Sequence, residues 1–146
     1  MSEDLAAQIN RAPGNGWVKA MGLVITHASV DEVRCEWDID ERHHQGYGIV
    51  HGGVYCGVIE TIASIGAHLV AMGRDQRTVG LENHTSFIRA VRSGRLRAVA
   101  RPVTRGRTTQ VWDGVIHDAA DQVVARGTVR LLCIANDQPL GVPPAR

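Results

Sequence analysis

One carboxylate in this sequence stands out because of its neighbours. Glu60 lies within a long apolar stretch, and the residues three and four positions away are Gly57, Cys56, Ala63 and Ser64. In a helix these side chains meet Glu60, and none of them is a cation that could pair with it. A carboxylate in such a place is costly unless it has remote partners or a water-filled site. Glu60 is therefore a candidate general base or nucleophile, unless it pairs with an arginine from a strand or lies on an exposed stripe.

A histidine and two glycines stand at the start of the same stretch. His51 precedes Glu60 by nine residues and is followed by Gly52 and Gly53. The first turn of a helix has unpaired backbone N–H groups at the positive end of the helix dipole, and glycine leaves them uncovered. An oxygen that gains negative charge during acyl transfer would be stabilised there. The alternative is a tight, closely packed turn in which His51 is a capping or core histidine.

These residues require a helix to hold them, and the flanking patterns predict strands. The segment 51–72 contains no proline, and Gly73 would make its C-cap. Two short strands are expected within 21–40, turning near residues 28–31, because apolar and polar residues alternate there. Four further strands are expected after the helix: 78–90, 95–104, 108–117 and 123–134. The breaks between them are short enough for hairpins, so we expect these four strands to form a meander.

A helix that is apolar nearly all round has to be buried on all sides. A curved antiparallel sheet wrapped around it would cover both the helix and the apolar face of the strands. We therefore predict an α+β fold in which about six antiparallel strands surround one long central helix. Near the N-terminus, 2–12 would form a short amphipathic helix with Ser2 as its N-cap, ended by the turn residues 13–16. The expected limits are 1–20 for an N-terminal extension, 21–134 for the main domain and 135–146 for a flexible tail.

Composition and charge exclude several classes of protein. With 146 residues and a net charge of +1, the chain is expected to form one domain and has no basic field for nucleic acid. Its three widely spaced cysteines indicate neither a disulfide framework nor a zinc site, so we expect no metal, no cofactor and a reducing, cytoplasmic location. Glu60, Ser64 and His68 interrupt the apolar stretch 54–71, which argues against a membrane span.

The run from Gln45 to Ser64 resembles the signature of the hotdog-fold thioesterases related to phenylacetate-pathway acyl-CoA thioesterases. It is most similar to the branch that holds one type of 4-hydroxybenzoyl-CoA thioesterase, the 1,4-dihydroxy-2-naphthoyl-CoA thioesterase and the enterobactin-pathway proofreading thioesterase. As in that branch, Gln45 stands six residues before His51, Glu60 stands eight after Gly52, and Ser64 follows four later. Much of the family carries aspartate at the position of Glu60, so the glutamate favours this branch. The similarity covers nearly the whole chain, and it implies the hotdog fold.

The resemblance also implies an activity and a role for each residue of the motif. The chain would hydrolyse an acyl-CoA thioester, or one on a carrier protein, with an aromatic or medium-chain acyl group. Gln45 and the Gly52 N–H would polarise the thioester carbonyl, and His51 would order the helix entrance and the substrate. Glu60 would attack the carbonyl or activate water, and Ser64 would hydrogen-bond the water or Glu60.

Residues around the motif are candidates for binding the substrate. Gly53 and Tyr47 flank the catalytic candidates, and both are expected to contact the ligand. Coenzyme A phosphates need exposed cations, and four arginines lie at strand ends: Arg89, Arg92, Arg105 and Arg107. The alternative for any one of them is a solvated charge at a sheet edge. The relatives differ among themselves around 82–84, so the resemblance assigns no role to those positions.

Helix geometry separates the two halves of the expected site. Gly52 and Glu60 would be about 12 Å apart, from a rise of ~1.5 Å over eight residues, which is too far for both to touch one carbonyl. The resemblance implies that two subunits pair and that each site takes Glu60 from one chain and Gly52 from the other, so we expect a homodimer or homotetramer. Two alternatives stay open: a non-catalytic acyl-CoA-binding hotdog protein, and a hotdog dehydratase or hydratase.

Overall fold

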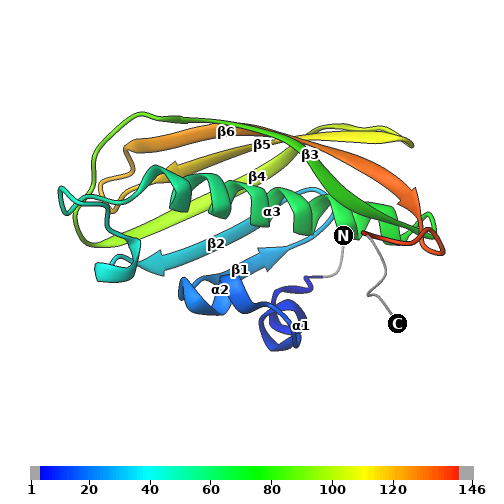
Figure 1. Cartoon of the computed structure of the whole chain (residues 1–146), viewed down its shortest axis with the longest axis horizontal. Helices are drawn as coiled ribbons and strands as arrows, with labels where there is room; N and C mark the ends of the chain where they lie inside the picture. Colours follow the sequence, from blue (N-terminus) through cyan, green and yellow to red (C-terminus); the bar gives the residue numbers. More distant parts are fainter. Residues whose placement is uncertain (1–3, 142–146) are drawn as a thin grey trace.

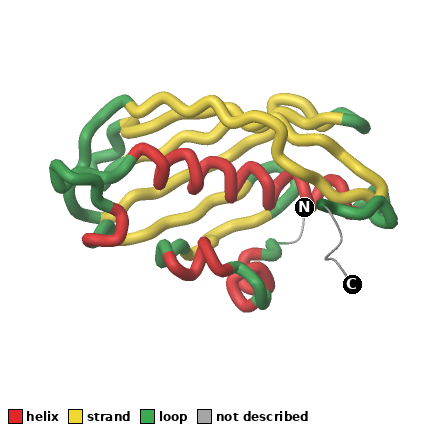
Figure 2. The backbone as a smooth tube through the Cα atoms, viewed as in Figure 1, coloured by secondary structure: helices red, strands yellow, loops and turns green. Residues whose placement is uncertain are grey.

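The structure consists of a curved sheet and one long helix that lies across its inner face (Figure 1 and Figure 2). It is a computed structural model and describes residues 4–141. The central helix is α3 (Gly52–Met72). Six strands form the sheet: β1 (Val24–Ala28), β2 (Val33–Asp38), β3 (Gln76–Phe87), β4 (Arg95–Arg105), β5 (Thr109–His117) and β6 (Val123–Ala135). All neighbouring strands are antiparallel, so the expected α+β hotdog arrangement is confirmed.

Alternating side chains give the sheet an apolar inner face. In β2, Val33, Cys35 and Trp37 are buried, while the residues between them are exposed or half-buried. The same alternation of buried and more exposed positions runs through β4 as far as Ala100 and through all of β5. Because successive side chains of a strand point to opposite faces, this pattern gives the sheet one face against the helix and one toward solvent.

α3 packs closely on β5 because small residues on each element face large ones on the other. A β-carbon at Gly66 of α3 would collide with the ring of Trp112, and a β-carbon at Gly114 of β5 would come within 2.9 Å of the Ile59 side chain. By length and composition alone α3 could cross a membrane, but more than half of its most apolar window is buried inside the domain. That burial is expected of the core helix of this fold. The helix ends at Met72, and Gly73 is its C-cap, as predicted.

The predicted meander is wrong in one link, because β3 pairs with β6 and not with β4. The order across the sheet is β1-β2-β4-β5-β6-β3, so β4 lies beside β2 and β3 forms an edge. The segment 88–94 connects β3 to β4 across three strand spacings, about 14 Å. Seven extended residues reach about 23 Å, so the connection is long enough for a crossing and not only for a hairpin.

The N-terminal region forms two short helices where one was predicted. α1 spans Ala6–Arg11, and Ser2, the predicted N-cap, lies outside the described residues. The Asp4 carboxylate instead accepts hydrogen bonds from the backbone N–H groups of Ala6 and Ala28, both at 3.0 Å. α2 (Gly16–Ala20) was not predicted, because the glycines and proline before it are typical of a turn. Both helices lie below β1 in Figure 1.

Candidate active site

Glu60 stands in the middle of α3 with its carboxylate directed toward β3. The side chain is half-buried, and its Oε2 accepts a hydrogen bond of 3.0 Å from Nδ2 of Asn83. Its Oε1 lies against the backbone of Gly80, where a β-carbon would collide with it. Among residues 4–141 no arginine, lysine or histidine forms an ion pair with Glu60. Glu60 is therefore not neutralised by an arginine from a strand, which was one of the alternatives to a catalytic role.

A cavity of about 320 Å³ opens beside Glu60, and we call it the Glu60 cavity. Glu60, Thr61, Ser64 and Ile65 of α3 form one wall. The other walls come from the N-terminal helices and the start of the sheet: Ile9, Asn10, Asn15, Val18, Lys19, Leu23 and Ile25. The Thr61 hydroxyl donates back to the Gly57 carbonyl at 2.7 Å, so it is turned toward the helix. Most of the surface of the Glu60 cavity is apolar, and polar and charged side chains that include Glu60 and Lys19 also line it, as expected of a small-ligand site.

The first turn of α3 offers an uncovered backbone donor. His51 is the N-cap, and its Nδ1 accepts a hydrogen bond of 2.8 Å from the Gly53 N–H. The Gly52 N–H has no hydrogen-bond partner within the part of the chain that the structure describes. A β-carbon at Gly52 would collide with the ring of Phe87, so this close packing requires glycine. The turn is therefore closely packed, as in the alternative prediction, with His51 as a capping residue, and the Gly52 N–H has no partner among residues 4–141.

The loop before α3 holds Gln45 close to that free N–H. The Gln45 carboxamide oxygen accepts from the Tyr47 N–H, and a turn through Gly48 with φ of +73° closes the loop. The Gln45 Nε2 has no acceptor among residues 4–141, so it remains available as a donor to a ligand. Tyr47 is 83% exposed, and its carbonyl accepts from Arg92 at 2.8 Å. The loops 39–51 and 88–94 lie together at this end of the molecule (Figure 1).

A second, smaller cavity of about 220 Å³ lies at this end, and we call it the Gly52 cavity. Its lining comes from the loop, the start of α3 and the end of β3: Gln45, Ile49, Val50, Gly52, Tyr55, Phe87, Ile88, Arg89 and Ala90. Tyr55 is 2% exposed, its hydroxyl has no partner within residues 4–141, and burial raises its pKa to about 12. Tyr55 therefore stays neutral at this cavity and can act there only as a neutral hydrogen-bonding group.

The predicted site residues divide into two groups within one chain. Gln45, His51 and Gly52 lie at the start of α3, while Glu60 and Ser64 line the Glu60 cavity. The two cavities share no lining residue. The two groups of predicted site residues therefore lie apart along α3, at separate cavities.

The predicted phosphate-binding arginines are also divided. Arg89 lines the Gly52 cavity. Arg105 is bound to the Asp31 carboxylate at 2.7 Å, in the turn before β2. Arg107 is exposed on the β4–β5 turn, which Arg74 ties to the last turn of α3 by donating to the carbonyl oxygens of Arg105 and Gly106. In one chain, therefore, Arg89 lies at the start of α3, and Arg105 and Arg107 lie near its end.

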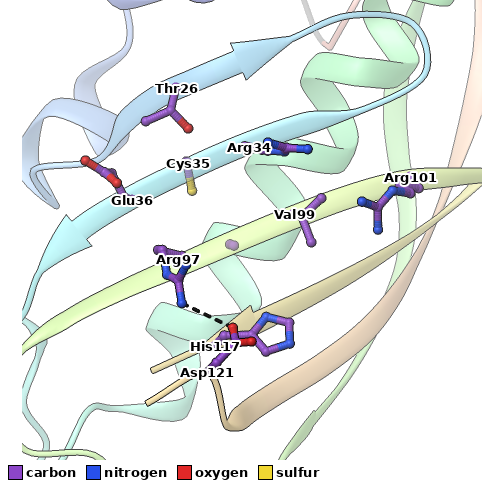
Figure 3. A pocket seen from close by; sticks show the side chains of 10 residues that line it. Thr26, Arg34, Cys35, Glu36, Arg97, Val99, Arg101, His117 and Asp121 are labelled. Atoms are coloured by element: carbon purple, nitrogen blue, oxygen red, sulfur yellow. Dashed lines mark hydrogen bonds and ion pairs between the residues drawn. The ribbon is translucent and has the colours of Figure 1, made fainter. Parts of the chain in front are cut away.

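A hollow of about 380 Å³ on the outer face of the sheet is a weaker candidate (Figure 3). Its lining includes charged side chains, and each arginine, aspartate and glutamate among them already forms an ion pair. Arg97 pairs with Asp121 at 3.1 Å, and Arg34 and Arg101 both pair with Glu32. No catalytic candidate from the sequence lies there.

Two features of the site were not found from the sequence. The first is Asn83, the hydrogen-bond partner of Glu60, to which no role was assigned. The second is α2, which supplies Val18 and Lys19 to the Glu60 cavity. The one available signal for α2 was Trp17, a large apolar residue in a segment otherwise typical of a turn. Its ring packs against Gly57 of α3, where a β-carbon would collide with it.

The sequence matches a known family over more than half of its length. Residues 47–125 match the Thioesterase superfamily. A protein of Mycobacterium tuberculosis, Rv1847, which is provisionally named an esterase, is 43% identical over 113 residues, or 76% of this chain and 81% of that protein.

Solved structures agree with this match. The structure of Rv1847 has a TM-score of 0.82 at 38% identity, covering 84% of this chain and 99% of that one. The thioesterase HI1161 of Haemophilus influenzae has a TM-score of 0.84 at 28% identity, covering 91% of this chain and 92% of that one. The likeness therefore extends over the sheet and its central helix.

Proposed function

Because the chain belongs to the thioesterase superfamily, we propose that it hydrolyses an acyl-CoA thioester with Glu60 as its catalytic carboxylate. The observation that carries this proposal is the state of Glu60. It is a half-buried carboxylate, held by an amide, without a cationic partner among residues 4–141 and beside an apolar cavity. A carboxylate neutralised by an arginine would be a poor base, whereas this one can accept a proton or attack a carbonyl.

The working site in this proposal lies between two subunits. β3 is an edge strand whose partner in the sheet is β6, so its outer edge can pair with β3 of a second copy. That pairing would set the two α3 helices side by side and antiparallel, with the start of one beside the middle of the other. Each site would then combine Glu60 with the partner subunit's Gly52. Two such dimers would form the expected homotetramer.

The residues would divide the hydrolysis between them. The Gly52 N–H and the Gln45 Nε2 would donate to the thioester oxygen as it becomes negative. Glu60 would either attack the carbonyl carbon, giving an anhydride that water cleaves, or remove a proton from the attacking water. In both routes the C–S bond breaks, coenzyme A leaves as the thiol and the acid is released. Ser64, one turn after Glu60 on the same cavity wall, would hydrogen-bond the water.

The acyl group would occupy the Glu60 cavity. Its volume of about 320 Å³ and its lining of Ile9, Val18, Leu23, Ile25 and Ile65 suit a medium chain or one aromatic ring. The fit rests on size and polarity, since apolar walls bind apolar acyl groups by removing their surface from water.

Glu60→Gln tests the proposal directly. The variant should lose at least ~100-fold in kcat, the scale for a positioned base or nucleophile, and should stay folded because an isolated half-buried carboxylate is not a stabilising group. The assay follows free thiol released from a panel of aromatic and medium-chain acyl-CoAs. Glu82→Gln is the matched control, because Glu82 is an exposed glutamate of β3 that pairs with Arg130.

Near-normal turnover by Glu60→Gln would contradict the proposal. The same assay separates the two alternatives. A non-catalytic acyl-CoA-binding protein would release no thiol, and a dehydratase or hydratase would change the acyl group while the thioester stays intact.

A further inference from the structure

Asn83 holds the Glu60 carboxylate through an amide whose orientation is fixed. Its Nδ2 donates to the Glu60 Oε2 at 3.0 Å and to the Cys56 carbonyl at 3.1 Å. Its Oδ1 accepts from the Thr85 hydroxyl at 2.6 Å. The nitrogen therefore faces two acceptors and the oxygen faces a donor, which only one orientation of the amide allows. Asn83 is half-buried, so these contacts form at the edge of the core, where water competes less than it does at the surface.

A bulge in β3 brings Asn83 and Gly80 to the same side. In a regular strand, residues three apart point to opposite faces. Here the register against β6 shifts between Gly80 and Glu82, so that Leu81 is an extra residue in β3. As a result both Gly80 and Asn83 face Glu60 of α3. Bulges often re-aim a side chain beside an active site, and this one does so at the candidate carboxylate.

The two carboxylate oxygens of Glu60 consequently differ. Oε2 is held by Asn83, while Oε1 lies beside Gly80 and accepts no hydrogen bond from residues 4–141. A carboxylate that attacks a carbonyl or takes a proton from water needs one oxygen free, and the other can be fixed. We propose that Asn83 is a positioning residue that holds Glu60 through Oε2 and so leaves Oε1 as the oxygen that reacts. This inference rests on the function proposed above.

Asn83 also links β3 to α3 by donating to the Cys56 carbonyl, so a purely structural role is the alternative to positioning Glu60. Loss of that bond alone would lower the thermal midpoint without changing the chemistry. Loss of the Glu60 contact would lower kcat and leave the binding of the substrate nearly unchanged, since Asn83 itself touches no ligand in this scheme.

Asn83→Leu removes both donors and keeps a similar size. We expect kcat on the best acyl-CoA to fall about 10- to 100-fold, the scale for a hydrogen bond to a charged group, with KM changed less than about twofold. Thr85→Val should lower kcat only about threefold, because Asn83 keeps its bonds to Glu60 and loses the contact that orients its amide. Thr128→Val is the matched control: its hydroxyl donates to Asp113 at 2.7 Å on the outer face, and kcat should not change.

A double-mutant cycle decides between the two roles. In the Glu60→Gln background, Asn83→Leu should cause no further loss of kcat, because the residue through which it acts is already gone. An equal loss in both backgrounds would overturn the inference and leave Asn83 a structural residue. In a crystal structure of Asn83→Leu, the Glu60 carboxylate should leave its place beside Gly80.

The outcomes also separate this inference from the proposed function. If Glu60→Gln keeps normal turnover, the proposed function fails and this inference fails with it. If Glu60→Gln is inactive while Asn83→Leu keeps normal kcat and an unmoved carboxylate, only this inference is overturned.

Discussion

The start and the middle of α3 carry the two halves of the proposed catalytic site. The first half supplies a backbone group, and the second supplies a side chain. At the start, the donor is the backbone N–H of Gly52, which has no hydrogen-bond partner among residues 4–141, and the missing side chain leaves room for the Phe87 ring. In the middle, the reacting group is the Glu60 side chain. Asn83 of β3 holds its carboxylate by a hydrogen bond, and Gly80 of β3 leaves space for the carboxylate because it has no side chain. The backbone half depends on a short local motif. The side-chain half depends on contacts between segments that are distant in sequence, so it is the more sensitive to changes elsewhere.

Mixing two inactive proteins would test whether these halves work across a subunit interface. Gln45→Ala and Glu60→Ala should each lose at least ~100-fold in kcat. After subunit exchange in an equal mixture, half of the dimers contain one subunit of each kind, and one of their two sites is intact. Activity should therefore return to about a quarter of the wild-type value under random pairing.

The control for this mixture is each variant carried alone through the same exchange, and exchange is verified by native mass spectrometry. Complete exchange without recovery would place the work of both residues within one chain. That result would contradict the proposed shared site, because the start and the middle of α3 would then act within the same chain.

Gly80→Ala tests the middle of α3 without replacing Glu60 itself. The new β-carbon would collide with the Glu60 Oε1, and the flexible end of that side chain can move aside, so the fold should survive. We expect kcat to fall about 30-fold because the reacting oxygen is displaced, as small misplacements at a reacting centre are costly. Gly73→Ala is the control, since its β-carbon would make only an ordinary contact at 3.6 Å. Equal kcat for the two variants would show that the position of Oε1 is unimportant.

The same contrast explains which parts were accessible from the sequence. The motif from Gln45 to Glu60 lies on one loop and one helix, so residue spacing predicts its geometry. Asn83 was missed because strand periodicity fails at the bulge of Leu81, and nothing local in the sequence indicates an extra residue. The pairing of β3 with β6 was missed because a short connection between two strands is compatible with a hairpin and with a crossover to another part of the sheet. Contacts between residues distant in sequence determine which of the two forms.

Val18→Phe tests whether the Glu60 cavity holds the acyl group. Val18 lies on α2 and lines this cavity, so a larger side chain removes space from it. We expect kcat/KM to fall about 10-fold for a medium-chain or aromatic acyl-CoA and to stay unchanged for acetyl-CoA, because overfilling a pocket discriminates by size. Val24→Phe is the control, since Val24 is half exposed on β1 and lines neither cavity. A uniform loss on all substrates would mean that α2 supports the fold and does not select the acyl group.

The smallest expected effect concerns the nucleotide end of the substrate, at the two ends of α3. Within one chain Arg89 lies at the start of α3 and Arg107 lies near its end, and both are exposed cations expected to contact coenzyme A phosphates. Each Arg→Ala variant should raise KM for acyl-CoA about 2- to 5-fold with little change in kcat, since one exposed charge pair contributes no more. The increase should fade at high salt because exposed charges are screened within ~10 Å at 0.1 M. An N-acetylcysteamine thioester lacks the nucleotide, so its KM should not change.

Arg105→Ala is the control variant and should leave KM unchanged with both substrates, because the Arg105 side chain already pairs with Asp31. If the Arg89 and Arg107 variants impair both substrates equally, these arginines act through the fold or the subunit contact instead.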